Sequence, residues 1–423
     1  MKFRRLPGTR DILPDEALIW EKVESVIRET AKSYSFFEIT TPTFESSCLF
    51  THSVGDTTDI VTKEMYTFID KGGREITLKP EGTAPVVRAY IENNLSAGPK
   101  PIKLFYIDRF FRYERPQKGR LREFHQFGAE VFGSSSTFVE VELLKLSFEI
   151  LEKLGFNELI VDINTIGCRD CSPKYKEALR DYLNNQKEEL CDDCKNRVER
   201  NVLRVLDCKK ESCKKVSQNA PKIINYLCND CKTQFEELKT NLDKFDINYK
   251  LNEHLVRGLD YYDKTVFEVI SSSLGSQNAL LGGGRYDYLV KDLGGIDTPA
   301  CGFALGMERL IMLIIEKNLI KMPSAAPFIY IINTGNNALI ESFKLANILR
   351  KENFITEVDL EGKGIKKGLS FAEKKGIKKV IIIGEDEVNN NNYILRDMDS
   401  RCQDTYFLDD LMSYLKSLKV EEE

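Results

Sequence analysis

The chain has 423 residues, of which 42% are hydrophobic and 30% are charged, so it is long enough for roughly two to four domains with ordinary buried cores. Its formal net charge of −5 argues against a protein that binds polyanions over its whole surface, although a local basic face is compatible with that charge. No apolar run approaches the ~18 residues of a membrane span, and the N-terminal segment turns polar before a signal-peptide core could form, which predicts a cytoplasmic protein without a membrane segment.

The first third of the chain predicts a helix and two hairpins. Apolar residues at helical spacing predict a helix over 15–34, and the segment FFEITTPTF that follows predicts a strand. The segments MYTFID and REITLKP alternate apolar and polar residues around a Lys-Gly-Gly turn, which is typical of an antiparallel hairpin. The aromatic segments IKLFYIDRFFRYE and LREFHQFGAEVFG predict a second hairpin, joined by the basic loop RPQKGR.

The middle of the chain contains an interruption. A helix is expected over 137–154 and a strand at ELIVDINTIG, but a cysteine-rich stretch then intervenes before the strand-like INYKLNEHLVRGLDYYDKTVFEVI. We interpret this stretch as an insertion. The glycine-rich LLGGGRYDYLV and the segment ACGFALGMERLIMLIIEKN, in which a short strand runs into a helix, complete this region.

The pattern changes after Lys321-Met322-Pro323. Strand-like FIYIIN, ITEVDL and KVIIIGE alternate with helices expected at about 337–351 and 364–376. Strands that alternate with helices predict a small α/β domain with a largely parallel or mixed sheet.

The second hairpin is unusually rich in charged side chains. Alternation along its strands should bring Arg112, Glu114, Gln126 and Glu130 within reach of one another. A solvated basic hairpin is the alternative, but it explains poorly why carboxylate, amide and guanidinium groups alternate with phenylalanines. The pattern therefore favours a phosphate or nucleotide site. The arginines of this region are Arg109, Arg112, Arg115, Arg120 and Arg122.

Eight of the eleven cysteines fall within one segment of the insertion. In a chain without a secretory signal, such clustering indicates a metal before disulfides. Two tetrahedral sites of four thiolates each would use all eight, which predicts structural zinc. Reduced thiols that never meet zinc are the alternative. The eight are Cys168, Cys171, Cys191, Cys194, Cys208, Cys213, Cys228 and Cys231.

Four peptides in order, RYERPQKGRLREFHQFGAEVFG, RGLDYY, GGGRYD and FALGMERL, resemble the histidyl-tRNA synthetases. FFEITTPTFE, the second hairpin and FALGMERL are similar to motifs 1, 2 and 3 of class II synthetases. RGLDYY and GGGRYD resemble the two peptides peculiar to the histidine enzymes. The resemblance extends to LKPEGTAPVVRAYIE and to the C-terminal module, and thus covers nearly the whole chain. Two departures are Lys79 before PEGT, where arginine is expected, and Met307, where leucine is usual.

The resemblance implies an α+β class II catalytic core, an antiparallel sheet flanked by helices, with a helical cysteine-rich insertion and a C-terminal α/β anticodon-binding domain. The expected segments are 1–165 with motifs 1 and 2, 166–240 as the insertion, 241–322 with the histidine peptides and motif 3, and 326–423 as the anticodon-binding domain. Motif 1 with Pro42 implies a homodimer. The tRNA(His) would meet the motif 2 loop with its acceptor end and the last domain with its anticodon.

The implied reaction explains the arginines. Activation of L-histidine is an attack of its carboxylate on the α-phosphorus of ATP, so the enzyme must hold two anions in line and stabilise developing charge. By resemblance, Arg112 contacts the α-phosphate, Arg120 and Arg309 address the outer phosphates and adenine, and Arg257 stabilises charge on the α-phosphoryl group. Mg²⁺ should accompany ATP. Without the resemblance, a salt bridge would be the better interpretation of Arg257.

The resemblance also implies a histidine pocket. A carboxylate on one ring N–H and a phenol at the other nitrogen would reject amino acids that lack this pair. A half-buried strand tyrosine is the alternative for Tyr262, and Gly282 to Gly284 predict either a close backbone approach to the ligand or a plain turn. By resemblance, the α-amino group is bound by Glu81, Thr83 and Gln126, and the imidazole by Glu130 and Tyr262, with Tyr286 close by.

Two other functions fit parts of this pattern. A synthetase-like regulatory subunit of ATP phosphoribosyltransferase would bind histidine as a signal and need no tRNA, but an intact RGLDYY with Arg257 and a full C-terminal domain argue against it. A tRNA-binding sensor without catalytic activity is disfavoured by the complete set of phosphate-binding arginines.

Overall fold

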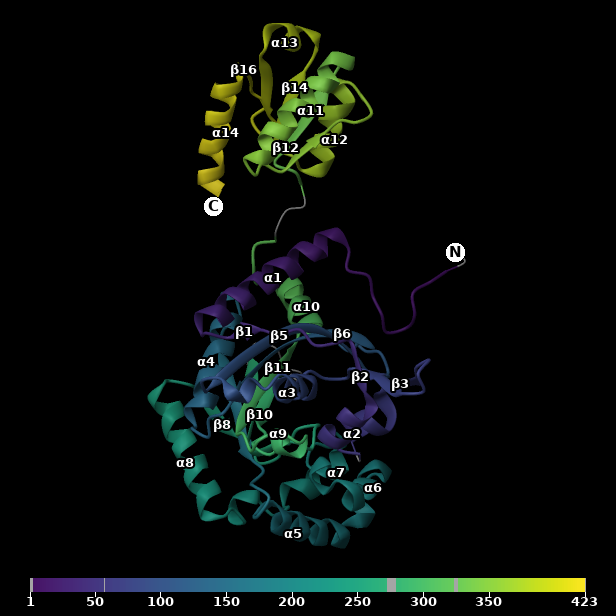
Figure 1. Cartoon of the computed structure of the whole chain (residues 1–423), viewed down its shortest axis with the longest axis vertical. Helices are drawn as coiled ribbons and strands as arrows, with labels where there is room; N and C mark the ends of the chain where they lie inside the picture. The colour runs from purple at the N-terminus through teal and green to yellow at the C-terminus, as the bar shows by residue number, and fades with distance from the viewer. Residues whose placement is uncertain (1–2, 57, 272–278, 323–325, 423) are drawn as a thin grey trace. The chain divides into compact units, whose positions relative to one another are not determined.

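A computed structural model describes residues 3–56, 58–271, 279–322 and 326–422. The chain divides into two compact units, Met1–Pro323 and Ser324–Glu423 (Figure 1). The predicted change of pattern at Pro323 lies outside the described residues. Within the described part of the chain, no helix is long and apolar enough to cross a membrane.

The first unit is built on an eight-stranded sheet in the order β1-β5-β6-β11-β10-β9-β7-β8. The six strands from β5 to β7 are antiparallel, whereas the outer pairs β1/β5 and β7/β8 are parallel. The sheet confirms the predicted class. Its strands are β1 (Phe37–Glu38), β5 (Ile102–Phe111), β6 (Glu123–Phe132), β7 (Leu159–Thr165), β8 (Tyr249–Leu251), β9 (Asp263–Ser271), β10 (Ala279–Arg285) and β11 (Ala300–Gly306).

Two predicted strands are divided. FFEITTPTF forms β1 and part of β2 (Phe44–Ser46) with Pro42 between them, because proline has no N–H to donate to a ladder. INYKLNEHLVRGLDYYDKTVFEVI forms β8 and β9 with a loop at 252–262 between them. The first predicted hairpin is confirmed as β3 (Tyr66–Ile69) and β4 (Glu75–Leu78), which pair with β2 in a separate three-stranded sheet.

Four helices pack on one face of the large sheet, against the odd-numbered side chains of β6. They are α1 (Pro14–Ser33), α4 (Phe138–Lys153), α8 (Asn229–Lys244) and α10 (Met307–Lys317). The first two confirm the predicted helices. Ile19, Val23 and Ile27 of α1 are buried at i, i+4 spacing, and Pro14 and the following acidic residues suit a helix start. The opposite face is partly covered by α3 (Thr83–Glu92) and α9 (Leu289–Asp292).

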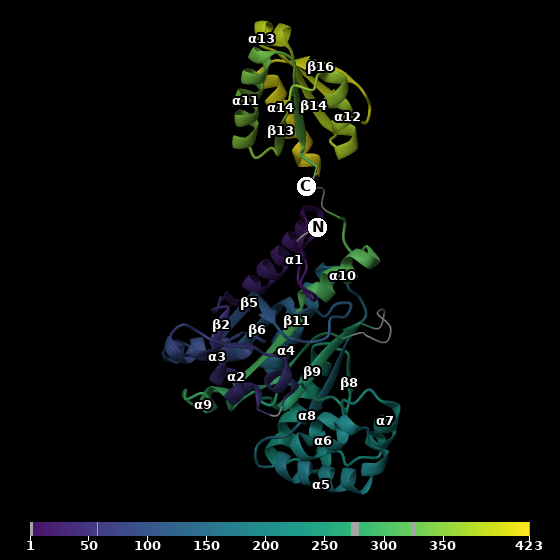
Figure 2. The same cartoon turned by 90° about the vertical axis from the view of Figure 1, so that its right-hand side faces the viewer.

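The cysteine-rich segment is helical, as predicted. Figures 1 and 2 show its helices side by side at one end of the first unit. They surround a small apolar core of their own. The expected boundary at residue 240 falls within α8, whose Phe235, Leu238 and Leu242 pack into the core of the large sheet. The helices are α5 (Ser172–Asn185), α6 (Asp192–Arg200), the short η4 (Val202–Val205), α7 (Glu211–Gln218) and the first turns of α8.

The second unit confirms the predicted α/β domain. Its sheet has the order β13-β12-β14-β15-β16. The pairs β13/β12 and β12/β14 are parallel, whereas β14/β15 and β15/β16 are antiparallel, so the sheet is mixed. Helices α11 and α14 pack on one face, and α12 on the other. The elements are β12 (Ile329–Asn333), α11 (Asn336–Lys351), β13 (Thr356–Val358), α12 (Ile365–Lys375), β14 (Lys379–Ile383), α13 (Glu385–Asn390), β15 (Tyr393–Asp397), β16 (Gln403–Tyr406) and α14 (Leu408–Glu422).

Candidate active site

Glycines leave room for functional side chains on the face of the large sheet that α3 and α9 partly cover. A Cβ at Gly302 would lie 1.7 Å from a carboxylate oxygen of Glu130, and one at Gly282 would lie 2.4 Å from the guanidinium carbon of Arg257. These positions need glycine because side chains of this chain occupy the space above them. The plain turn offered for Gly282 to Gly284 is wrong, since all three lie in β10.

Glu130 lies at the bottom of a buried polar pocket. Its side chain is 1% exposed, and it accepts hydrogen bonds from the Thr83 hydroxyl at 2.8 Å and from the Tyr286 hydroxyl at 2.5 Å. Burial raises the pKa of Glu130 to about 8, although both hydrogen bonds favour its ionised form. The pocket therefore holds a carboxyl group that an N–H donor or a cation would return to its ionised state.

Glu81 provides a second buried carboxylate at the start of α3. It accepts hydrogen bonds from the backbone N–H groups of Thr83 and Ala84, each at 2.8 Å. The Tyr261 hydroxyl donates to it at 3.3 Å. Burial raises the pKa of Glu81. Tyr261, which sequence reasoning did not select, lies beside the predicted Tyr262, and its place in the same RGLDYY peptide was the available signal.

Three tyrosines form one wall of this pocket. The ring centroids of Tyr261 and Tyr262 are 4.7 Å apart, and those of Tyr262 and Tyr286 are 6.4 Å apart. Burial raises the pKa of Tyr262 to about 12, so its phenol is neutral and can donate or accept. Five of the six predicted histidine-binding residues are thus linked by direct contacts. Gln126 shares the face of β6 with Glu130 by strand alternation and lies opposite Gly306.

A cavity of about 900 Å³ adjoins the tyrosine pocket and contains all four predicted arginines. They come from three separate segments, namely the hairpin loop at 112–122, the 252–262 loop and the start of α10. Carboxylates and one aromatic ring share the walls. These residues are Arg112, Arg120, Arg257 and Arg309, with Glu114, Glu268, Glu308 and Phe124.

The cavity is electrostatically prepared for an anion. Burial lowers the pKa of Arg309, and the nearby charge of Arg120 lowers it further. An anion that enters between two such cations relieves their mutual repulsion, so its binding is favourable. Arg309 also lies in the first turn of α10, where the helix dipole adds partial positive charge.

Arg112 is held at the edge of this cavity. Its Nε donates to the carbonyl oxygen of Pro80 at 2.8 Å, and its guanidinium carbon lies 5.2 Å from the ring centroid of Phe124. Strand β5 ends at Phe111, so Arg112 and Glu114 lie beyond it and line the cavity. Alternation predicted one polar cluster of Arg112, Glu114, Gln126 and Glu130. The structure divides it, because Arg112 and Glu114 line the cavity while Glu130 lies in the tyrosine pocket.

Arg257 lies where the cavity and the tyrosine pocket meet. Its guanidinium forms an ion pair with Glu268 of β9 and lies near Tyr262. The salt bridge that a generic interpretation offers for this arginine is thus present. Glu268 was not selected from the sequence, although alternation places it opposite Gly282 on the same face.

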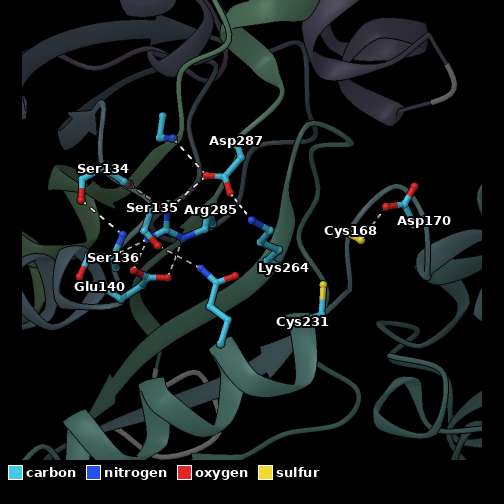
Figure 3. A network of polar contacts seen from close by, with 12 residues as sticks. Ser134, Ser135, Ser136, Glu140, Cys168, Asp170, Cys231, Lys264, Arg285 and Asp287 are labelled. Atoms are coloured by element: carbon cyan, nitrogen blue, oxygen red, sulfur yellow. Dashed lines mark hydrogen bonds and ion pairs between the residues drawn. The ribbon is translucent and has the colours of Figure 1, made fainter. Parts of the chain in front are cut away.

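The arginine of GGGRYD has a structural role. Arg285 is fully buried, pairs with Glu140 of α4, and donates to the carbonyl oxygens of Ser134 at 3.1 Å and Ser136 at 2.9 Å (Figure 3). Asp287 joins Arg285 to Lys264. This network fastens the end of β10 to α4.

The two departures from the family pattern are buried. Lys79 donates to the carbonyl oxygen of Thr41 at 3.0 Å and pairs with Asp108, and Met307 packs in the main core. The positive charge of Lys79 therefore forms an ion pair, and the apolar side chain of Met307 fills part of the core.

The eight clustered cysteines form two nested groups of four, and each group could hold a metal ion. Within each group the sulfur atoms lie within 4.8 Å of one another. None of these cysteines forms a disulfide. The outer group is Cys168, Cys171, Cys228 and Cys231, and the inner group is Cys191, Cys194, Cys208 and Cys213.

Comparisons with known proteins show which family the chain resembles. The family model described as histidyl-tRNA synthetase matches residues 8–310, and an anticodon binding domain model matches residues 329–418. The histidine–tRNA ligase of Acetivibrio thermocellus is 47% identical over 410 residues, which is 97% of this chain and 98% of that protein. The crystal structure of apo S. aureus histidyl-tRNA synthetase matches with a TM-score of 0.81 and 34% identity, covering 97% and 99% of the two chains.

A more distant structure shares only the fold. It is described as an ATP phosphoribosyltransferase regulatory subunit/histidyl-tRNA synthetase from Bacillus halodurans C, and it matches with a TM-score of 0.61 at 20% identity, covering 91% of this chain and 99% of that one.

Proposed function

The chain belongs to the histidyl-tRNA synthetase family, and from this membership we propose how its own residues activate L-histidine with ATP and transfer it to tRNA(His). The observation that carries the proposal is the adjacency of two sites. A buried carboxyl–tyrosine pocket suits an imidazole, and a cavity with four arginines suits a triphosphate. Exchange of pyrophosphate into ATP that depends on histidine tests it.

In the tyrosine pocket, we assign Glu130 and Tyr262 to the imidazole ring. The Glu130 carboxylate accepts one ring N–H, and the neutral Tyr262 phenol meets the other nitrogen. An amino acid without this pair would leave buried polar groups unpaired, which penalises it without any editing reaction. Tyr286 holds Glu130 in place through its hydroxyl. Glu81, Thr83 and Gln126 are assigned to the α-amino group.

In the cavity, we assign the arginines to the phosphates of ATP. Arg112 contacts the α-phosphate, and Arg120 and Arg309 contact the outer phosphates and adenine. Arg257 exchanges its bond to Glu268 for the charge that develops on the α-phosphoryl group during attack by the histidine carboxylate. The cavity carboxylates Glu114 and Glu268 offer oxygen ligands and would hold a Mg²⁺ ion that accompanies ATP, and such an ion would neutralise phosphate charge.

We further propose that zinc is the metal of the eight insertion cysteines. In each group the four sulfur atoms lie within 4.8 Å of one another. Four thiolates are a ligand set that Zn²⁺ prefers in tetrahedral structural sites. The four functional segments are then 1–165 and 241–322 for catalysis, 166–240 for metal binding, and 326–423 for the anticodon.

We also propose that the chain is cytoplasmic and forms a homodimer. Phe37 and Phe44, on either side of Pro42, are 72% and 56% exposed in the isolated chain. Aromatic side chains on motif 1 strands suit burial against a second copy. Light scattering of the purified chain measures this, and a monomeric mass at micromolar concentration would exclude the dimer.

The regulatory-subunit alternative is less well supported. The structure with that description shares only the fold at 20% identity. A histidine sensor needs the tyrosine pocket but has no use for four arginines in the adjacent cavity. Histidine binding without pyrophosphate exchange would reinstate this alternative.

A further inference from the structure

The inner cysteine group joins the starts of two insertion helices. Cys191 directly precedes α6 and Cys194 lies in its first turn, whereas Cys208 precedes α7 and Cys213 lies in its first turn. The backbone N–H of Cys191 points to the sulfur of Cys213 at 3.3 Å. Helix N-termini carry partial positive charge, which stabilises thiolates.

The spacing of the sulfur atoms suits one tetrahedral ion. With Zn–S bonds of about 2.3 Å, the sulfurs of a tetrahedral site lie about 3.8 Å apart. The sulfurs of Cys191 and Cys208 are 4.0 Å apart. In the outer group, Cys168 and Cys171 are 3.7 Å apart, and Cys168 and Cys228 are 3.8 Å apart.

The inner group shares an apolar core with the loop that carries Arg257. Cys194 and Cys213 are fully buried in the small insertion core, and Val256 of the 252–262 loop packs in that same core. Val256 directly precedes Arg257. On the other side of Arg257, the Asn201 amide donates to the Asp260 carboxylate at 2.7 Å. The insertion therefore holds this loop on both sides of Arg257.

The same part of the insertion forms a wall of the arginine cavity. Residues from η4 to α7 line the cavity, and one of them is Cys208 of the inner cysteine group. These residues are Arg204, Leu206, Asp207, Cys208, Lys209 and Lys214.

We propose that a zinc ion held by Cys191, Cys194, Cys208 and Cys213 is a positioning element of the active site, because it fixes the insertion core against which Val256 holds Arg257. This inference rests on the proposed function and on the assignment of zinc. A structural metal contributes much of the folding free energy of a small domain. Without it, the loop would lose its support, and Arg257 its alignment with the α-phosphorus.

The test compares Cys191→Ser with Cys402→Ser in the full chain. Cys191 does not line the cavity, and Cys402 is an exposed cysteine of the second unit. Metal analysis after chelator-free purification should give two zinc ions for the wild-type chain and for Cys402→Ser, and one for Cys191→Ser. Replacement of zinc by Co²⁺ should produce the charge-transfer bands of tetrahedral thiolate sites, at half the intensity in Cys191→Ser.

The kinetic readout is single-turnover formation of histidyl-adenylate. Cys191→Ser should form it on the order of 10- to 100-fold more slowly, while histidine affinity changes by less than about twofold, because misalignment lowers turnover more than binding. Val256→Ala should slow the step in the same way and keep both zinc ions, which tests the link without removing a ligand. Zinc returned to chelator-stripped wild-type protein should restore the rate.

Each failure points to a different claim. A wild-type chain without zinc and without cobalt bands overturns the metal site. Loss of one zinc ion in Cys191→Ser with an unchanged rate of adenylate formation overturns the positioning role. A wild-type chain that holds two zinc ions but lacks histidine-dependent pyrophosphate exchange overturns the proposed function and leaves the metal site standing.

Discussion

Replacement of Glu130 by glutamine should make the protein more stable at neutral pH and poorer at binding histidine. Burial raises the pKa of Glu130 from its ordinary value of 4.5 to about 8. Between these two values the folded chain holds a proton that the unfolded chain releases, so this group destabilises the fold progressively as the pH rises. Keeping a carboxyl group of pKa 4.5 protonated at pH 7 costs about 3 kcal/mol.

Glutamine cannot ionise, so the variant should lose this dependence on pH. The difference in unfolding free energy between Glu130→Gln and wild type should grow in favour of the variant by about 2 kcal/mol from pH 5 to pH 7. Histidine affinity should fall on the order of 100-fold, because a buried charged acceptor for the ring N–H is lost. ATP affinity should change by less than about twofold, since the arginine cavity is intact.

Urea unfolding at several pH values and calorimetric titration with histidine and ATP measure these effects. Glu123→Gln, at the other end of the same strand and on its opposite face, is the matched control and should leave histidine affinity unchanged. A constant stability difference between pH 5 and pH 8 would refute the reasoning about burial. Equal losses of histidine and ATP affinity would refute the assignment of Glu130 to the ring.

Three further outcomes are expected. Arg257→Ala should slow single-turnover adenylate formation by ~10²- to 10³-fold with little change in ATP or histidine affinity, and Arg257→Lys should not restore it, because an ammonium cannot reproduce the planar guanidinium contact; near-normal adenylate formation would remove its catalytic role. Arg309→Ala should weaken ATP binding more than histidine binding in equilibrium titrations, and the reverse order would move Arg309 out of the nucleotide site. Deletion of 326–423 should spare pyrophosphate exchange but greatly reduce tRNA charging, and loss of exchange in a folded, dimeric product would contradict the division of labour between the units.

The elements that could be predicted from the sequence are those whose structure a local pattern determines. Both hairpins and the helix at 15–34 followed from periodicity, because burial of one face imposes a period of two or 3.6 residues. The prediction of one continuous strand at FFEITTPTF was wrong, since a single proline interrupts its ladder.

Partners chosen by the tertiary fold could not be predicted in this way. The sequence places Glu268 on a strand, but its bond to Arg257 exists only because Gly282 on the neighbouring strand leaves room for the guanidinium. Alternation likewise suggested one polar cluster, which the end of β5 at Phe111 divides between cavity and pocket. Cysteine spacing indicated eight ligands but not the nested pairing, which depends on which helix starts meet.

The proposed function requires that this chain couple a histidine pocket to an ATP-activating cavity. Pyrophosphate exchange into ATP, measured with each of the twenty amino acids and followed by charging of tRNA(His), tests it most directly. We predict exchange with histidine alone and esterification of tRNA(His) by the same preparation. A folded protein that binds histidine but supports no exchange would exclude this coupling.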